Sequence, residues 1–486
     1  MMKKFLYIGL LLCCISAQAQ NSFSLIDSLR KEIIPVGGNV CISIYDLTAN
    51  KTIYNYQEKK LTRPASTAKL MTTITYLSKP YSKEHFHTEV WYDGTINQDT
   101  LKGDIYVVGG FDPEFGIAAM NKLVDRIANL PFNVISGHIY GDISMKDSLY
   151  WDHGWCWDDN PESFQPYLSP LMFHKDFITI TAYPSTQPGT PARLVCSPTS
   201  TYYTVTNETK SNTYSAGRFS ATRGWMYNSN NIIVRGNVTQ PCTYEVNLFS
   251  SEKFFMHVFL EQLQAKGIKV NKDYSFREFH RNSNSVCIIK HETSVKRVIK
   301  QMLLESDNLN AEALLYHMAA LDSLKKHISS DEGLNIINNF IKQLGYDPQN
   351  YNIKDACGLS IYDLVSPELL IDFLKYAYAH PKIFKTLYRS LPIAGVKGTL
   401  KNRMKRTSAY ANVHAKTGTC TAVSTLAGYL KMRNGHRVAF AVLCSNILSD
   451  SIPIKFQDKV CTYLCNTGIS NLEDTNGLNS EENADD

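Results

Sequence analysis

Residues 415–430, AKTGTCTAVSTLAGYL, combine the triplet Lys416-Thr417-Gly418 with the alternating pattern of a β-strand. A second strand-like run, HRVAFAVLCSN, follows the turn residues Arg433-Asn434-Gly435, and Asn-Gly is the strongest short signal for a β-hairpin. This part of the chain therefore predicts neighbouring antiparallel strands. Two shorter motifs lie upstream of it, first Ser66-x-x-Lys69 and then Ser306-x-Asn308.

The first motif begins a segment with helical spacing directly after Pro64, so the hydroxyl of Ser66 and the amine of Lys69 share one helix face. Such a pair suits acyl transfer, because a serine hydroxyl is a poor nucleophile until a neighbouring base accepts its proton. A lysine can be that base only if its pKa is lowered. The pattern alone is weak, and its position between a predicted hairpin and a predicted helix distinguishes it from the other three examples: Ser28/Lys31, Ser250/Lys253 and Ser323/Lys326.

The second and third motifs carry complementary polar groups. Ser306 and Asn308 interrupt a helical stretch, where Ser306 could relay a proton to a leaving group and Asn308 could hold a substrate amide. A simpler alternative makes Ser306 a helix N-cap. Lys416 offers a cation, and Thr417 and Thr419 offer hydroxyls, to an anionic group of a substrate; an exposed turn is the alternative here.

The composition is that of a globular protein with two or three domains, since 44% of its 486 residues are hydrophobic and 20% are charged. Residues 1–19 predict a secretory signal peptide, and the apolar run 5–15 is too short for a membrane span. An uncleaved anchor is the alternative. Loss of two lysines with this segment lowers the net charge from +5 to +3, which is too mild to indicate nucleic acid binding.

The cysteines do not predict a metal site. Ten remain after the signal segment, without the paired spacing or neighbouring histidines of a zinc site, and we expect no metal and no cofactor. Cys461 and Cys465 are four residues apart on a predicted helix, so a local disulfide is conceivable.

The chain divides into three predicted parts after the signal peptide. Residues 20–84 and 292–468 form a catalytic domain in which helical patterns and strands alternate. Residues 85–291, rich in Tyr, Thr, Ser and Asn with many short alternating runs, predict an inserted β-rich module of two subdomains. Residues 469–486 are acidic and predict a disordered tail.

With three motifs in this order, the chain resembles the D-alanyl-D-alanine carboxypeptidase/endopeptidase penicillin-binding proteins of low-molecular-mass class C, serine peptidase family thirteen. The interval of 236 residues between Lys69 and Ser306 distinguishes this family, because related β-lactamases have a far shorter one. The resemblance implies an α/β fold of the β-lactamase/transpeptidase type, with an antiparallel sheet flanked by helices and a large β-rich insertion. Further collinear stretches support it: GDIYVVGGFDPEF, GHIYGDISMKDSLY, GWCWDD, DACGLS and LPIAGVKGTLKNRM.

The resemblance also implies residue roles. Ser66 corresponds to the acylated nucleophile, Lys69 to its base and Ser306 to a proton shuttle. Backbone N–H groups of Ser66 and Cys420 correspond to the oxyanion hole. The implied substrate-binding residues are Asn308, Lys416, Thr417, Thr419, Cys420, Leu359, Trp155 and Asp158.

The stem-peptide preference stays open at this point, because the chain departs from the family pattern. Cys357, Ile361 and Asp363 stand where the family commonly has serine, arginine and asparagine, and that arginine helps to bind a stem-peptide carboxylate. Trp155 and Asp158 match positions that in relatives line a pocket for the amine of a diamino acid.

These features predict an exported, wall-facing serine DD-peptidase, in the periplasm or loosely associated with a membrane, without a transmembrane segment after signal cleavage. Its substrates would be peptidoglycan stem peptides or cross-links, cleaved through an acyl-enzyme on Ser66, and β-lactams would be covalent inhibitors. The alternatives are a β-lactamase or esterase of the same fold and a non-catalytic peptidoglycan-binding homologue. The balance of carboxypeptidase and endopeptidase activity stays open.

Overall fold

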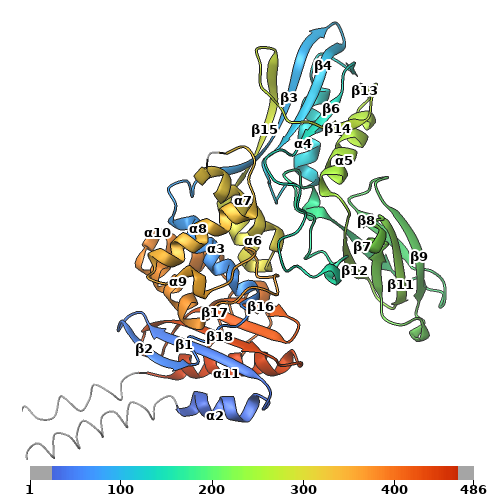
Figure 1. Cartoon of the computed structure of the whole chain (residues 1–486). Coiled ribbons are helices and arrows are strands. Elements are labelled where there is room, and N and C mark those ends of the chain that lie inside the picture. The colour runs from blue at the N-terminus through green and yellow to red at the C-terminus, as the bar shows by residue number, and fades with distance from the viewer. Residues whose placement is uncertain (1–23, 324, 469–486) are drawn as a thin grey trace, which may run out of the picture.

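The structure is a computed structural model that describes residues 24–323 and 325–468 (Figure 1). The predicted signal peptide and acidic tail lie outside the described residues. Within the described ranges, no helix combines the length and the apolar character needed to cross a bilayer.

A five-stranded antiparallel sheet forms the base of the catalytic part, and both hairpins predicted from the sequence are present in it. Its strand order places the N-terminal hairpin beside the C-terminal one, with Ile42 opposite Val442. The strands are, in spatial order, β16 (His414–Cys420), β17 (Val423–Lys431), β18 (Arg437–Ser445), β1 (Asn39–Asp46) and β2 (Lys51–Tyr56). β16 is therefore an edge strand.

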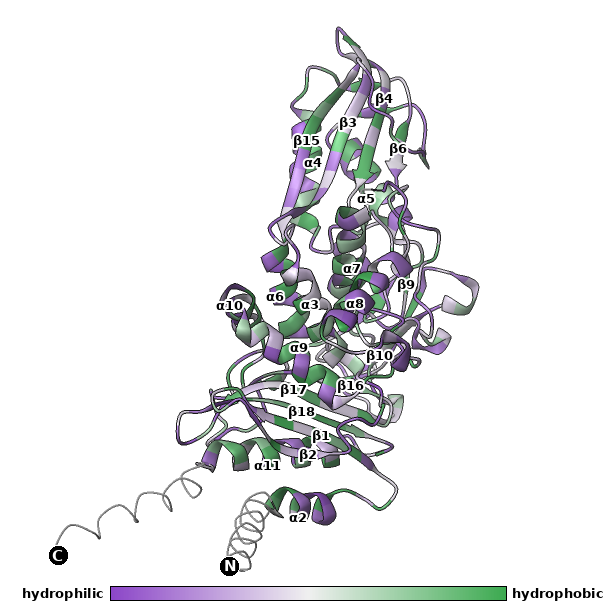
Figure 2. Ribbon diagram, turned by 60° about the vertical axis from the view of Figure 1, so that its left-hand side comes forward, coloured by the Kyte–Doolittle hydropathy of each residue, from purple (hydrophilic) through white to green (hydrophobic). Residues whose placement is uncertain are grey.

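Both faces of this sheet are covered by helices, which explains why β17 and β18 are almost continuously apolar and buried. The helices α2 (Ser24–Ile33) and α11 (Ser451–Asn466) pack on one face (Figures 1 and 2). A helical layer covers the other face. It consists of α3 (Ala68–Ser78), α6 (Val295–Glu305), α7 (Asn308–Ser323), α8 (Ser330–Gln343), α9 (Pro367–Ala379) and α10 (Pro381–Ser390).

The insertion leaves and rejoins this helical layer at one place. Its first strand, β3 (His85–Asn97), pairs antiparallel with its last, β15 (Ser285–Ser294), and His85 lies opposite Ser294. Because the two ends are adjacent, a large module can be inserted without separating α3 from α6.

The insertion contains one mixed seven-stranded sheet and two three-stranded sheets. It also contains α4 (Ile117–Ala128) and α5 (Ser251–Ala265), which the β-rich pattern did not predict. The remaining strands of the large sheet are β4 (Thr100–Gly109), β5 (Val134–Ile135), β6 (Ile139–Asp142), β13 (Lys269–Val270) and β14 (Tyr274–Phe276). One small sheet consists, in spatial order, of β12 (Cys242–Asn247), β7 (Phe177–Tyr183) and β8 (Arg193–Ser197). The other consists of β10 (Ser220–Arg223), β11 (Asn231–Val238) and β9 (Thr204–Ser211).

All ten cysteines within the described residues are free thiols. The conceivable disulfide between Cys461 and Cys465 is not formed, and both side chains are buried on α11.

Replacement of Ile42 by alanine tests the role of the central sheet. Ile42 is fully buried between β18 and β2, so Ile42→Ala should lower the free energy of unfolding by ~2–5 kcal/mol, as cavity-forming core changes do. Denaturant unfolding of the purified chain measures this. Leu448→Ala is the control, because Leu448 is 91% exposed and its truncation should change stability by at most ~0.5 kcal/mol. Equal effects of the two variants would contradict this account of the core.

Candidate active site

The turn that carries Ser66 is fixed against the sheet by its proline. Residues Ala65–Thr67 form a short 3-10 helix that leads directly into α3. The carbonyl oxygen of Pro64 accepts hydrogen bonds from the hydroxyl of Thr67 at 2.6 Å and from that of Thr425, on β17, at 2.7 Å. The hydroxyl of Ser66 is therefore presented at the start of a buried helix while remaining partly accessible.

Lys69 lies one helical turn after Ser66 and is fully buried. Its amine donates to Ser66 Oγ at 2.9 Å, to Asn308 Oδ1 at 2.7 Å and to the carbonyl oxygen of Cys357 at 2.8 Å. Burial lowers the pKa of Lys69, although nearby acidic groups oppose the shift. A lysine with a lowered pKa beside a serine hydroxyl can accept the serine proton.

The second motif sits in the tight turn between α6 and α7. Ser306 has a left-handed backbone, with φ 63°, at the C-terminal end of α6. The carboxylate of Asp307 accepts from the backbone N–H of Asn310 at 3.0 Å, so Asp307 caps α7. The N-cap alternative for Ser306 is therefore wrong, and its hydroxyl accepts from Lys416 Nζ at 2.8 Å instead.

The third motif occupies the edge strand β16, which passes close to the serine turn. A Cβ at Gly418 would lie 2.8 Å from the backbone nitrogen of Ser66, so no larger residue fits without a shift. Lys416 is fully buried, while Thr419 is exposed. Burial and, second, the neighbouring Lys69 hold the pKa of Lys416 well below its usual range. The three motifs thus meet as the sequence predicted.

The other predicted residues occupy different environments. Leu359 and Cys420 are half-buried, and Thr417 Oγ1 lies 2.7 Å from Thr399 Oγ1. Trp155 is 9% exposed and packs in the core, where its indole N–H donates to Asp355 at 2.9 Å. Asp158 is exposed.

Asp355 organises the loop that reaches Lys69, a role that the sequence did not reveal. Its carboxylate accepts from the backbone N–H of Gly358 at 2.6 Å and of Ser360 at 2.7 Å. These bonds curl the DACGLS segment so that the carbonyl of Cys357 faces Lys69. The only signal available was that segment's position in the family pattern.

Glu312 supports the same loop from α7, one turn after Asn308. Both of its carboxylate oxygens accept from the backbone N–H of Ala356, at 3.0 and 3.2 Å. Burial, with the carboxylates of Asp152 and Asp355 nearby, raises the pKa of Glu312 well above its ordinary value. Burial also raises the pKa of Asp152 to about 6.

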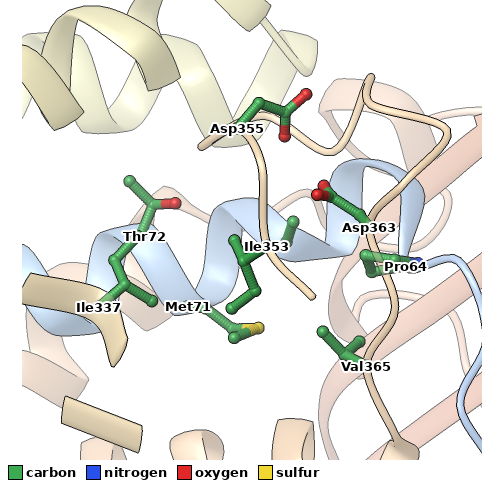
Figure 3. Close-up of a pocket in the computed structure, with 9 residues that line it drawn as sticks. Pro64, Met71, Thr72, Ile337, Ile353, Asp355, Asp363 and Val365 are labelled. Carbon is green, nitrogen blue, oxygen red and sulfur yellow. The ribbon is translucent and has the colours of Figure 1, made fainter. Parts of the chain in front are cut away.

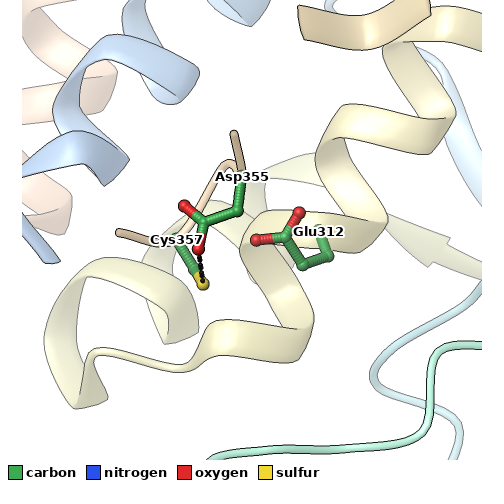
Figure 4. A group of neighbouring side chains, drawn as sticks. All are labelled: Glu312, Asp355 and Cys357. Carbon is green, nitrogen blue, oxygen red and sulfur yellow. Dashed lines mark hydrogen bonds between the residues drawn. The ribbon is translucent and has the colours of Figure 1, made fainter. Parts of the chain in front are cut away.

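Glu312, Asp355 and Cys357 are close enough to be considered as metal ligands, because one ligand atom of each lies within 4.8 Å of the others (Figure 4). The two carboxylates, however, already bind backbone N–H groups of the loop. A cation there would compete with those bonds for the carboxylate oxygens, and it would lie close to the amine of Lys69, whose pKa these same three residues affect. The donor set therefore fits a loop anchor better than a metal site.

A small enclosed pocket lies between α3 and the loop that follows Asp355 (Figure 3). None of the three motifs contributes a polar side chain to its wall. Its lining residues are Pro64, Ala68, Met71, Thr72, Ile337, Ile353, Asp355, Asp363 and Val365. Of the positions where the chain departs from the family pattern, Cys357 and Asp363 are buried and Ile361 is exposed.

Comparisons with known proteins agree with this geometry. The family model of the D-Ala-D-Ala carboxypeptidase 3 (S13) family matches residues 26–466. A D-alanyl-D-alanine carboxypeptidase of Actinomadura sp. is 25% identical over 456 residues, 90% of this chain and 83% of the relative. The D-alanyl-D-alanine carboxypeptidase DacB of Haemophilus influenzae is 23% identical over 414 residues, 84% of this chain and 85% of the relative.

Solved structures match the fold. Penicillin binding protein 4 (dacB) from Haemophilus influenzae superposes with a TM-score of 0.79 at 20% identity, covering 91% of this chain and 99% of that one. The same protein complexed with a β-lactam gives a TM-score of 0.73 over the same shares of both chains, at 18% identity. The predicted α/β fold with its inserted β-sheets is confirmed.

Gly358 offers a test of how the loop positions Ser66. It has φ +81°, and a Cβ there would lie 1.9 Å from the carbonyl oxygen of Ala65. Gly358→Ala should therefore displace the serine turn and slow acylation of Ser66 by a β-lactam roughly 100-fold, the cost of misplacing a reacting group by about 1 Å. Labelling with a fluorescent penicillin measures the rate.

The matched control is Gly345→Ala, because Gly345 also has a positive φ, +94°, but has nothing within 4 Å of a Cβ. It should lose about 1–2 kcal/mol of stability from its backbone conformation and label at the normal rate. Unchanged labelling of Gly358→Ala would refute the steric argument.

Proposed function

The chain belongs to the D-Ala-D-Ala carboxypeptidase 3 (S13) family of serine peptidases, and we propose that Ser66 is its acylated nucleophile and Lys69 the base. The class of enzyme, a serine DD-carboxypeptidase, is that of the family. The observation that carries the assignment of residues is the 2.9 Å hydrogen bond between Lys69 Nζ and Ser66 Oγ, made by a fully buried amine. In its neutral form Lys69 can donate to Asn308 and Cys357 and accept from the hydroxyl of Ser66, whose proton it takes as Ser66 attacks.

Acylation then proceeds at the carbonyl between two D-alanines. Ser66 Oγ bonds to the carbonyl carbon and the C–N bond breaks. The proton that Lys69 took from Ser66 passes through Ser306 to the leaving amine, which leaves Lys69 neutral again. The backbone N–H groups of Ser66 and Cys420 hold the oxyanion of the tetrahedral intermediate. Water subsequently attacks the ester, with Lys69 as the base, and releases Ser66.

Lys416 has two linked tasks in this proposal. Its hydrogen bond to Ser306 supports a proton shuttle through that hydroxyl. With Thr417 and Thr419 it binds the terminal carboxylate of the substrate. Burial and, second, Lys69 lower the pKa of Lys416 in the empty site, and an arriving carboxylate would raise it again. Substrate binding and a gain of positive charge at Lys416 are therefore coupled.

The proposal also includes substrate contacts farther from the serine. Asn308 is close to Lys69 and can still offer its amide to the substrate backbone, as can Leu359 through its partly accessible position. The exposed carboxylate of Asp158 suits the amine of a diamino acid. Trp155, which donates to Asp355, would act by shaping the DACGLS segment. Ile361 supplies no cation for a stem-peptide carboxylate.

The setting of the enzyme follows from the same proposal. We place residues 20–84 and 292–468 in the catalytic domain and 85–291 in an inserted module of two subdomains. The signal-like segment 1–19 and the peptidoglycan substrate suit an exported, wall-facing protein. A relative's complex with a β-lactam supports β-lactams as covalent inhibitors.

Covalent labelling tests the nucleophile and the base. A fluorescent penicillin should modify Ser66, located by mass mapping of the adduct. Lys69→Ala should slow labelling at least 100-fold while the chain remains folded, since general-base catalysis supplies that much. Labelling of the unaltered chain should slow in acid, because protonation of Lys69 removes the base. Lys79→Ala, at the end of α3, is the control and should label normally; normal labelling of Lys69→Ala would remove Lys69 from this role.

Digestion of purified muropeptides separates the two activities of the family. A carboxypeptidase releases free D-alanine from pentapeptide monomers, and an endopeptidase converts cross-linked dimers to monomers. β16 is an edge strand whose first residues, His414 and Ala415, pair with residues 392–393. Because an extended peptide can align along the following residues of this edge, we expect both substrates to be cleaved. Chromatography of the products measures each rate, and a dimer rate at the level of Ser66→Ala would exclude the endopeptidase.

A further inference from the structure

A half-buried lysine of the insertion, Lys175, contacts the turn that carries the second motif. Lys175 Nζ lies 2.7 Å from Asp307 Oδ2, and Asp307 stands between Ser306 and Asn308. The same amine lies 2.6 Å from Glu114 Oε1 and 2.8 Å from Asn310 Oδ1. The network joins two separate loops of the insertion to one short turn of the catalytic part.

The backbone around Lys175 is unusual. His174, Lys175 and Asp176 have φ values of 50°, 57° and 62°, so three consecutive non-glycine residues adopt the left-handed conformation. Such a run persists only where the surroundings hold it in place. Here the N–H of His174 donates to the carbonyl of Phe115 at 2.9 Å, and Asp176 accepts from the N–H of Tyr167 at 2.8 Å.

This turn directs the lysine toward Asp307. Asp307 is 12% exposed at its side chain and Glu114 is 8% exposed, so both carboxylates meet the amine of Lys175 largely out of water. Glu114 also pairs with the exposed Arg297 at 3.2 Å. The other oxygen of Asp307 caps α7 through Asn310. Asp307 is thus held on both sides, by α7 and by the insertion.

The residues on either side of Asp307 make the contacts of the proposed mechanism. Ser306, in its left-handed conformation, accepts from Lys416, and Asn308 accepts from Lys69. The insertion makes a second contact with this turn, because Asn308 Nδ2 donates to the carbonyl of Phe164 at 2.8 Å. A shift of Asp307 would therefore move both functional groups together.

We propose that Lys175 is a positioning residue, which fixes the Ser306–Asn308 turn by holding Asp307 against the insertion. The inference rests on the proposed function, from which the roles of Ser306 and Asn308 are taken. It makes the insertion part of the catalytic apparatus, because the chemistry requires a cation that the insertion supplies. Loss of Lys175 would leave Asp307 without its cation, while Glu114 would keep Arg297 at 3.2 Å, so the contact that holds the turn against the insertion would be lost and Asp307 would be free to shift.

The full chain with single substitutions provides the test. Lys175→Met should slow acylation of Ser66 by a fluorescent penicillin roughly 10- to 100-fold, the range expected for a misplaced catalytic group. Lys175→Arg should restore part of the rate. Lys266→Met is the matched control, because Lys266 pairs with Asp125 at 2.7 Å elsewhere in the insertion, and it should label within about twofold of the unaltered chain.

A double-mutant cycle shows whether Lys175 acts through Asp307. Asp307→Asn removes the same ion pair and keeps an oxygen for Asn310, so it should also slow acylation. The combined Lys175→Met/Asp307→Asn chain should then be no slower than the slower single variant. If the effects of the two single substitutions on the acylation rate multiply in the combined chain, the proposal is overturned. A Lys175→Met acylation rate equal to that of Lys266→Met would also overturn it. Should Lys175→Met not fold, Asp307→Asn alone must be slow.

Hydrogen exchange separates this proposal from the proposed function. The backbone amides of residues 308–310 should exchange faster in Lys175→Met than in Lys266→Met, whether or not penicillin reacts. If penicillin fails to label the unaltered chain, the proposed function is refuted, but the exchange measurement still tests the positioning role of Lys175. Equal exchange in the two variants would refute the positioning role.

Discussion

The buried amine of Lys69 is the interaction on which the site depends, because it joins three segments that are far apart in sequence. It bonds to Ser66 on its own helix, to Asn308 at the start of α7 and to the carbonyl of Cys357 in the DACGLS segment. An amine without partners would be costly to bury, so the surrounding fold must supply all three acceptors. Each acceptor is held in place by a different set of contacts.

The contacts that hold these acceptors in place come from residues around Lys69. Asp355 and Glu312 bind the backbone of the DACGLS segment, and Asp307 caps α7. All three side chains are carboxylates. Together with the two buried lysines, Lys69 and Lys416, they give the interior ionisable groups of both charge signs. The raised pKa of Glu312 and the lowered pKa of Lys69 both follow first from burial. Burial therefore favours the neutral forms of these groups, which lowers the free-energy cost of placing them in the interior.

The sequence alone was enough to predict the three motifs and the central sheet, but not the residues that hold the motifs in place. Ser66, Ser306 and Lys416 were predicted because their residue types, order and secondary structure agree with acyl transfer, and both hairpins follow from local alternation. Asp355 and Glu312 carry no local pattern, since their partners are backbone N–H groups of a loop. Lys175 could not be found either, because its contact with Asp307 joins residues 132 positions apart and depends on three left-handed residues. Helices α4 and α5 were missed where polar composition outweighed their apolar spacing.

In the proposed function, the charge balance of the site favours an anionic substrate. Lys69 and Lys416 are both fully buried, and burial and then the nearby Lys69 lower the pKa of Lys416, so two full charges in the empty site are unfavourable. A base needs Lys69 neutral, whereas carboxylate binding needs Lys416 charged. A terminal carboxylate beside Lys416 stabilises a proton there and, through repulsion between the amines, keeps Lys69 unprotonated. In this proposal the anion of the substrate also favours the protonation state that the chemistry requires, and a substrate without that anion would lose rate as well as affinity.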